Sequence, residues 1–216
     1  EFWVETDSDA EAKTDSDAGA AWNSDDEAGT VTTTPFWQEG ASLLDKKLLF
    51  AIDTDRHDLI QSLIDDGADV NKNTSNGDYP TPLATAAGRG YDKCLKSLLE
   101  AGADPNKKIE CRGIYTPLTY AASQGHHRCV KLLLDAGVDY DKIGYNRFSA
   151  LMEAASDKGN DVCVNLLLEA GANPNYVNEN NESALTCASE AGNEEIVNML
   201  INAGANLNVK DNSGNT

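Results

Sequence analysis

The sequence predicts an all-α solenoid, a stack of short helix–turn–helix units, preceded by an acidic low-complexity segment. Two observations lead to this architecture. A phrase ending in Gly-Ala-Asp, or a close variant of it, recurs every 33 to 35 residues from about residue 41 to the end of the chain. Residues 1–40 lack this repeat and contain almost no aliphatic side chains. A period this short indicates one supersecondary unit that is copied and stacked, because such units bury their apolar faces against one another.

Residues 1–40 are expected to form an acidic, intrinsically disordered arm. They hold eleven carboxylates and one base, Lys13, and so carry −10 of the net charge of −19. Such a composition cannot bury enough apolar area to offset the entropy of ordering. The arm also holds all three tryptophans, which we expect to anchor it on a partner surface. They are Trp3, Trp22 and Trp37. Packing against the first helical unit is an equal alternative for Trp37.

The repeat that begins at Thr116 shows how one unit is built. We expect Thr116 to cap a first helix, with Pro117 at its first position, where a missing N–H costs nothing. Gly125 should end this helix. A second helix is expected from about His127, with apolar residues at helical spacing. Gly137 should end it, in the left-handed conformation that glycine adopts at low cost.

The same frame divides residues 41–216 into a capping repeat and four full repeats. The full repeats are expected to start near residues 81, 116, 149 and 183. Residues 43–69 fit the two-helix frame without a cap of the Thr-Pro-Leu type, and we interpret them as the N-terminal capping repeat that such arrays require. Thr216 occupies the next cap position. We therefore expect the array to be truncated at residue 216, at the start of a further repeat.

These motifs make the chain from about residue 43 to 216 resemble the ankyrin repeat family. They are the Thr-Pro-Leu opening, the paired alanines, the Gly between the helices and the Leu-Leu-x-x-Gly-Ala-Asp-x-Asn exit. The resemblance implies units of two antiparallel helices with a projecting β-hairpin finger, stacked into a curved solenoid. One feature departs from the family pattern, because the His that usually follows Thr-Pro-Leu is absent. Its place is taken by Ala84, Thr119, Met152 and Thr186.

Asparagines stand at one register after the helix-ending glycines. They are Asn71, Asn106, Asn175 and Asn208. The resemblance implies that such residues can be substrates of an asparaginyl hydroxylase. A simpler interpretation is that their side chains satisfy backbone groups of the turns. The two roles are compatible.

The fingers carry the features that the repeat does not explain. We number the fingers along the chain: finger one is residues 72–80, finger two 107–115 and finger three 141–148, and finger four precedes Ser183. Fingers one and two should each be longer by two residues, because the helix-ending Gly and the next cap are 14 residues apart there and 12 residues apart in the later repeats. Fingers one to three also carry a modest basic stripe. The resemblance implies that ligands meet the finger tips and the first helices. Apolar residues beside the bases near these tips suit a partner with both acidic and hydrophobic side chains. The alternative is that charged finger tips are merely solvated. The candidate partner-binding residues are Lys72, Arg89, Lys107, Lys108, Ile109, Arg112, Ile114, Tyr120, Gln124, Lys142, Ile143, Tyr145 and Arg147.

Composition excludes several classes of function. A net charge of −19 argues against binding to nucleic acid or an anionic membrane, and no apolar run is long enough to cross a bilayer. Five cysteines, an odd number, do not suggest a disulfide framework. Three of them, Cys94, Cys129 and Cys163, share one register and are expected to be buried apolar residues. We expect no metal or cofactor, and a cytoplasmic location, with the nucleus as a further compartment.

The best-supported function is a non-enzymatic protein–protein interaction module or scaffold. The only histidines are His57, His126 and His127, and no serine or cysteine is placed to pair with them. The arm is expected either to fold back on the basic fingers or to bind a basic, histone-like partner. Two alternatives remain open. One is a substrate-recruiting adaptor of a larger enzyme or ubiquitin-ligase assembly. The other is a sensor of a small phosphate ligand held by Lys107, Lys108 and Arg112.

Overall fold

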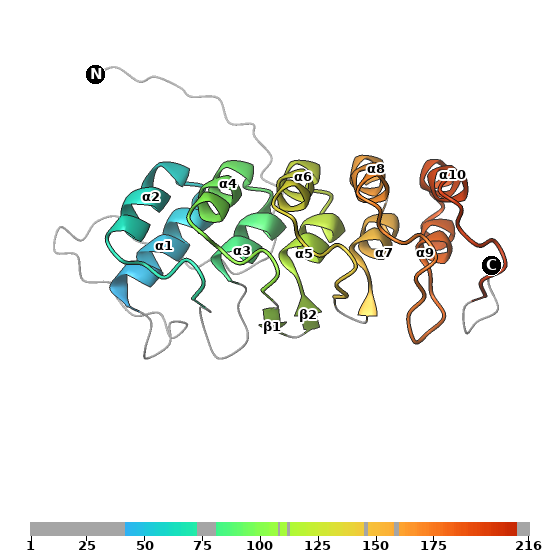
Figure 1. Ribbon diagram of the computed structural model, residues 1–216, viewed down its shortest axis with the longest axis horizontal. Helices are drawn as coiled ribbons and strands as arrows, with labels where there is room; N and C mark the ends of the chain where they lie inside the picture. The colour runs from blue at the N-terminus through green and yellow to red at the C-terminus, as the bar shows by residue number, and fades with distance from the viewer. Residues whose placement is uncertain are drawn as a thin grey trace, which may run out of the picture. The chain divides into compact units, whose positions relative to one another are not determined.

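The described residues of the computed structural model form five helix pairs in one compact unit, Trp37–Thr216. They are residues 42–72, 81–107, 109–111, 113–144, 147–157 and 160–210, with the backbone alone described for 109–111 and 113–115. The arm and its tryptophans therefore lie outside the described residues. Figure 1 shows the pairs side by side in a row, with one helix of each pair in each of two layers.

The first helix of each pair forms one layer, and we call these the inner helices. They are α1 (Leu43–Asp53), α3 (Pro82–Arg89), α5 (Pro117–Ser123), α7 (Ala150–Ala155) and α9 (Ala184–Ala191). The outer helices are α2 (His57–Asp65), α4 (Asp92–Glu100), α6 (His127–Asp135), α8 (Asp161–Glu169) and α10 (Glu194–Asn202). We number the repeats 1 to 5, as residues 42–72, 81–107, 116–142, 149–176 and 183–210. Each of them contains one inner and one outer helix.

Hydroxyl side chains begin the inner helices of repeats 2 to 5, as predicted. In repeat 3, the Thr116 hydroxyl accepts a hydrogen bond from the Thr119 N–H, and the Thr119 hydroxyl accepts one from the Thr116 N–H. Ser183 and Thr186 form the same capping box in repeat 5. These two threonines stand where the family usually has His. Their side chains satisfy backbone donors at the helix start, so the departure supplies a local cap.

The start of α1 has a cap that the sequence comparison did not identify. The Ser42 hydroxyl accepts a hydrogen bond from the Asp45 N–H at 3.1 Å, and the Asp45 side chain accepts one from the Ser42 N–H. Alignment of the buried Leu48 with Leu83 of repeat 2 places the cap register at Lys46. The helix instead extends one turn farther toward the N-terminus. The sequence comparison missed the cap because it assumed equal helix lengths.

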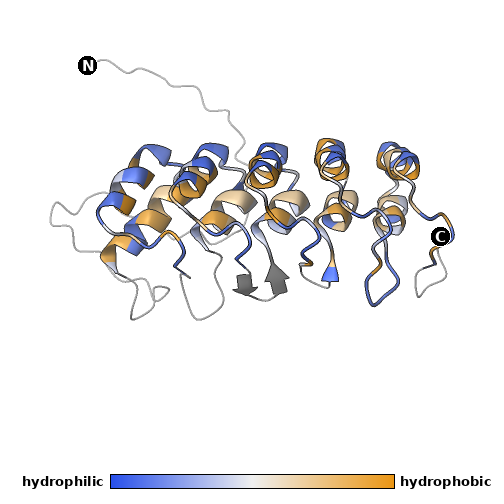
Figure 2. Cartoon of the chain, viewed as in Figure 1, coloured by the Kyte–Doolittle hydropathy of each residue, from blue (hydrophilic) through white to orange (hydrophobic). Residues whose placement is uncertain are grey.

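The core is one continuous cluster that runs through the whole stack. Figure 2 shows hydrophobic residues in both helix layers and hydrophilic ones along the far side of the outer helices. Cys94, Cys129 and Cys163 are at most 1 % exposed, which confirms their predicted place in the core. Burial raises the pKa of the Cys94 and Cys129 thiols to about 12 and that of Cys163 to about 11. These thiols stay protonated and unreactive at neutral pH. No helix among the described residues is long and apolar enough to cross a membrane.

A β-hairpin is formed in finger two. Strand β1 (Ile109–Cys111) pairs antiparallel with β2 (Gly113–Tyr115), with Ile109 opposite Tyr115. In finger four, a single bridge joins Val177 to Ser183. Residues 73–80 of finger one lie outside the described residues. The strands of finger two and the loop of finger four point away from the outer helices (Figure 1).

Close contact between repeats constrains the turn that follows each inner helix. Gly125 ends α5 with φ 71°, and a Cβ at this position would collide with Asn160 Oδ1 of the next repeat. Gly102 also has a positive φ, 85°, but a Cβ there would meet nothing within 4 Å. The first glycine is therefore required by both conformation and space, and the second by conformation alone.

We predict that Gly125→Ala destabilises the array more than Gly102→Ala. Both variants force a side chain into the left-handed region, at roughly 1–2 kcal/mol. Only Gly125→Ala must also displace Asn160, which adds roughly 1–3 kcal/mol. Urea denaturation followed by circular dichroism measures the difference. Equal losses in the two variants would contradict the predicted close contact.

Candidate functional site

One face of the inner helices stays open to solvent. In α5, Leu118, Ala121 and Ala122 are fully buried, whereas Tyr120 is partly exposed and Gln124 is exposed. Open positions recur at the fifth, eighth and ninth residues counted from the cap, a spacing that places them on one side of a helix. We call this stripe the inner-helix face. Its members are Phe50, Asp53, Thr54, Thr85, Gly88, Arg89, Tyr120, Ser123, Gln124, Glu153, Ser156, Asp157, Glu190 and Ala191, whereas Cys187 at the fifth position of repeat 5 is buried.

Three sequence-predicted residues lie together on this face in repeats 2 and 3. Arg89 forms an ion pair with Asp53 of repeat 1 at 3.2 Å. Burial raises the pKa of Asp53, and the Arg89 charge opposes that shift. The ring of Tyr120 lies over Gly88, where any side chain would collide with it. Gln124 is exposed at the end of α5. This part of the face combines an aromatic ring with a paired guanidinium.

The same face becomes acidic in repeats 4 and 5, which sequence reasoning missed. Glu153 occupies the register of Tyr120, and Asp157 and Glu190 lie nearby on the stripe. Burial raises the pKa of Glu153 to about 7. A shallow hollow of about 350 Å³ lies beside these residues. It is lined by Phe148, Ser156, Glu182, Cys187, Glu190 and Ala191. The change from Tyr120 to Glu153 at one register was the signal in the sequence that could have revealed this acidic part of the face.

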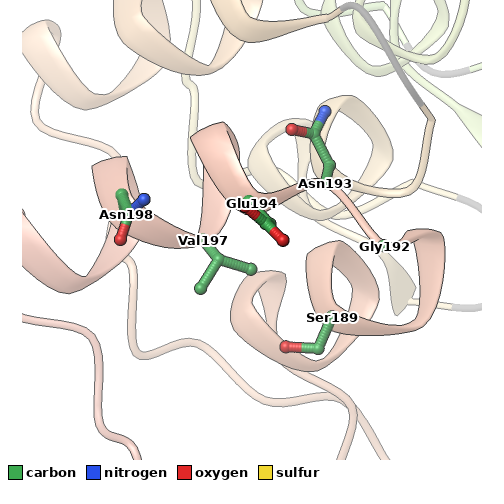
Figure 3. A pocket seen from close by; sticks show the side chains of 6 residues that line it. All are labelled: Ser189, Gly192, Asn193, Glu194, Val197 and Asn198. Atoms are coloured by element: carbon green, nitrogen blue, oxygen red, sulfur yellow. The ribbon is translucent and has the colours of Figure 1, made fainter.

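A second hollow lies at the turn between α9 and α10 (Figure 3). Its lining includes Gly192, Asn193 and Glu194. At the corresponding turn of repeat 2, a ring nitrogen of His126 from repeat 3 lies 3.0 Å from the Gly88 oxygen. We therefore interpret this hollow as a repeat-stacking surface and not as a separate binding site.

Three bases of the predicted stripe are engaged within the array. The Lys107 ammonium donates to the Asn71 carbonyl, and the Lys142 ammonium donates to the Asn106 carbonyl at 3.0 Å. Arg147 forms an ion pair with Glu179 of finger four at 2.9 Å. These contacts join neighbouring repeats or fingers, so the first role of these bases is structural.

The other predicted finger residues are only partly placed. Lys72 is exposed and Ile143 is half-buried. The backbones of Ile109 and Ile114 belong to β1 and β2. The structure does not bring these four into one described side-chain cluster. Three further candidates lie outside the described residues, namely Lys108, Arg112 and Tyr145.

The registered asparagines connect successive repeats. The Asn71 side chain accepts from the Asp104 N–H at 2.8 Å and donates to the Gly102 oxygen at 3.2 Å. Asn175 makes the same two bonds, to Asn206 and Gly204. Asn106 accepts from the Asp139 N–H at 3.0 Å. The turn interpretation was thus right about backbone groups, but the groups belong to the following repeat. Hydroxylation of these asparagines stays a prediction.

In the first repeat, the equivalent backbone N–H is bonded by a side chain of the same repeat. The Asp69 N–H, which corresponds to that of Asp104, donates to Asp45 Oδ1 of the same repeat at 2.9 Å. Asp45 is 7 % exposed and thus links the start of α1 to the turn after α2. It acts where an asparagine of the preceding repeat acts in repeats 2, 3 and 5.

The family comparison agrees with this geometry. A family model for ankyrin repeats (3 copies) matches residues 48–144 and 141–211. The chain belongs to the ankyrin repeat family. A comparison with curated proteins gives no match. As an ankyrin repeat protein, the chain is a protein–protein interaction module, and this family is typically non-enzymatic.

The histidines of this ankyrin array lie at the starts of outer helices. His57 and His127 are the first residues of α2 and α6, and His126 precedes α6. His126 is used in stacking on repeat 2. Among the residues that the structure describes, no group of three or more His, Cys, Asp or Glu could hold a metal ion.

We predict that Asn175→Ala destabilises this ankyrin array by about 1–3 kcal/mol, because it removes two hydrogen bonds that join repeats 4 and 5. Asn208→Ala is the matched control. The Asn208 side chain is exposed, and among the described residues only its backbone N–H is bonded, to Asn206. Thermal and urea denaturation should show a small change for this control. Similar losses in both variants would argue against the inter-repeat role.

We also predict a pH-dependent effect of Glu153. Its pKa is about 7 in the folded array and near the ordinary value of 4.5 in the unfolded chain, so the folded state binds more protons between these values. The stability that proton binding to Glu153 adds to the folded array is therefore fully present below pH 4.5, and it is lost as the pH rises to about 7. The stability of Glu153→Gln relative to the parent should increase from pH 5 to pH 8.

Urea denaturation at the two pH values measures this difference. Glu190→Gln controls for the removal of one negative charge from the same face. A difference between Glu153→Gln and the parent that is independent of pH would show that burial does not perturb this carboxyl group.

Proposed function

We propose that this ankyrin array binds an extended segment of a partner protein along the inner-helix face and the fingers. The observation that supports this most directly is the continuity of that face. Every repeat contributes open positions at the eighth and ninth residues counted from the cap, and the stripe runs through α1, α3, α5, α7 and α9. A row of aligned positions suits an extended ligand, because successive side chains can meet successive repeats.

The residues along the face suggest the chemistry of this segment. Arg89 and Tyr120 in repeats 2 and 3 favour acidic and hydrophobic side chains. Finger two adds Lys108 and Arg112 from the sequence, although both lie outside the described residues. At repeats 4 and 5, Glu153 and its acidic neighbours disfavour an acidic segment. The proposed ligand therefore has its acidic and hydrophobic part opposite repeats 2 and 3.

The acidic arm is proposed as a second binding element. Its charge of −10 and its tryptophans suit a basic, histone-like partner. Folding back on the basic fingers is the competing arrangement. Lys107, Lys142 and Arg147 are already engaged within the array, which favours the external partner. The same engagement of Lys107 leaves the phosphate-sensor alternative without a supporting contact. The adaptor role in a larger assembly stays an alternative.

A capture experiment with charge-reversed baits tests the inner-helix face. Arg89→Glu changes the face, whereas Arg128→Glu changes an outer helix, and each arginine pairs with an aspartate of the preceding repeat. We expect Arg89→Glu to lose partners that Arg128→Glu and the parent chain retain, with quantitative mass spectrometry as the measurement. Retention of every partner by Arg89→Glu would overturn the proposed surface.

The same capture, repeated with residues 41–216 at two salt concentrations, tests the arm. Partners that need the arm should be lost from 41–216 and should weaken with salt in the full chain. If residues 41–216 instead capture more partners than the full chain, the arm covers the fingers and fold-back is favoured.

A further inference from the structure

The links between the end turns of neighbouring repeats are interrupted at one junction. Asp141 of repeat 3 stands at the position that an asparagine occupies in repeats 1, 2 and 4. Among the described residues, the Asp141 side chain makes no hydrogen bond to repeat 4, whereas each of the three asparagines bonds to the repeat that follows it. The equivalent acceptor and donor in repeat 4 would be the Gly171 oxygen and the Asn173 N–H.

The chemistry of the carboxylate explains why the donated half of this contact is lost. The Asn71 amide donates to the Gly102 oxygen and accepts from the Asp104 N–H, so it needs both halves of the amide. A carboxylate has no N–H to donate, and its charge is repelled by the partial negative charge of the Gly171 oxygen. Asp141 therefore cannot make the paired contact.

A second contact between end turns also has a different partner at this junction. Lys107 and Lys142 each donate to the carbonyl of the asparagine in the preceding repeat. The corresponding residue of repeat 4 is Tyr176, and its hydroxyl donates to the Arg147 oxygen at 3.0 Å instead of the Asp141 oxygen. Repeats 3 and 4 thus lack both of the end-turn links that join repeats 1, 2 and 3.

Helix packing continues across the junction. Helix α5 packs against α7 and α6 against α8, as at the other junctions. The Asn160 amide donates to the Ala122 oxygen at 3.4 Å, and Tyr140 lies beside Gly171. The junction is therefore closed in this structure but held with fewer polar contacts at its end turns.

We propose that the array opens first between repeats 3 and 4, so that repeats 4 and 5 unfold as one block while repeats 1 to 3 remain folded. In a stacked array, stability depends on the coupling between neighbours, and the weakest junction decides where partial unfolding starts. Each missing hydrogen bond changes an opening equilibrium by about two- to twelvefold. A partner segment that spans repeats 3 and 4 would bind the closed form and suppress this opening.

Hydrogen exchange of the 216-residue chain, followed by mass spectrometry, tests the proposal. In the parent chain, amides of α8 and α10 should share one opening rate that exceeds the rates of α4 and α6. Asp141→Asn restores the amide that the other junctions use. It should slow exchange in α8 and α10 together, by about fivefold or more, and leave α4 and α6 unchanged.

Two further variants separate the proposal from simple fraying at the end of the array. Asn106→Asp should move the weak junction one repeat earlier, so that α6 exchanges with α8 and α10. Asn175→Asp should speed exchange in α10 more than in α8. The proposal is wrong if Asp141→Asn leaves the protection of α8 unchanged, or if α4, α6, α8 and α10 exchange at one rate in the parent chain.

Discussion

Contact between neighbouring repeats is the interaction on which the rest of this structure depends. The outer helices have 9 residues each, which is below the length at which isolated helices are stable in water. They persist because the apolar side chains of one pair are covered by the next pair, in a single core that runs through the stack. Alanines in the inner helices, such as Ala121 and Ala122, keep adjacent pairs close together.

This dependence on stacking changes how the polar residues should be interpreted. A lysine on an acidic protein suggests a ligand contact, but Lys107 and Lys142 hold the end turns of successive repeats. His126 suggests catalysis, but its ring lies against the turn of repeat 2. Groups that remain available for binding are those whose register faces solvent, above all on the inner-helix face. A functional surface in such an array consists of what stacking leaves unused.

Much of the fold could be predicted from the sequence, because each position in one repeat can be compared with the equivalent positions in four others. The register of Cys94 with Ile196 predicted burial, and the hydroxyl residues before Leu83 and Leu118 predicted caps. The comparison failed where one unit departs from the rest. Ser42 was missed because α1 is a turn longer than the register allows.

The candidate site was less predictable for a related reason. Charge and exposure of the finger residues could be read from the sequence, but their contacts could not. The ion pair of Arg147 joins finger three to finger four, and the backbone of Arg147 has a positive φ of 59°. Glu153 was overlooked because the change from Tyr120 to Glu153 at one register does not by itself show that the carboxyl group is buried.

The sequence by itself determined the repeat, the order of helices and the face of each helix that is buried, because these follow from local spacing and capping chemistry. Only the tertiary structure decided which atoms meet across the junctions. Asn71 reaches Gly102 and Lys142 reaches Asn106, over more than thirty residues of sequence. Periodicity specifies that two units stack, but hydrogen bonds require distances near 3 Å, and those distances are set by how closely the cores of adjacent repeats pack.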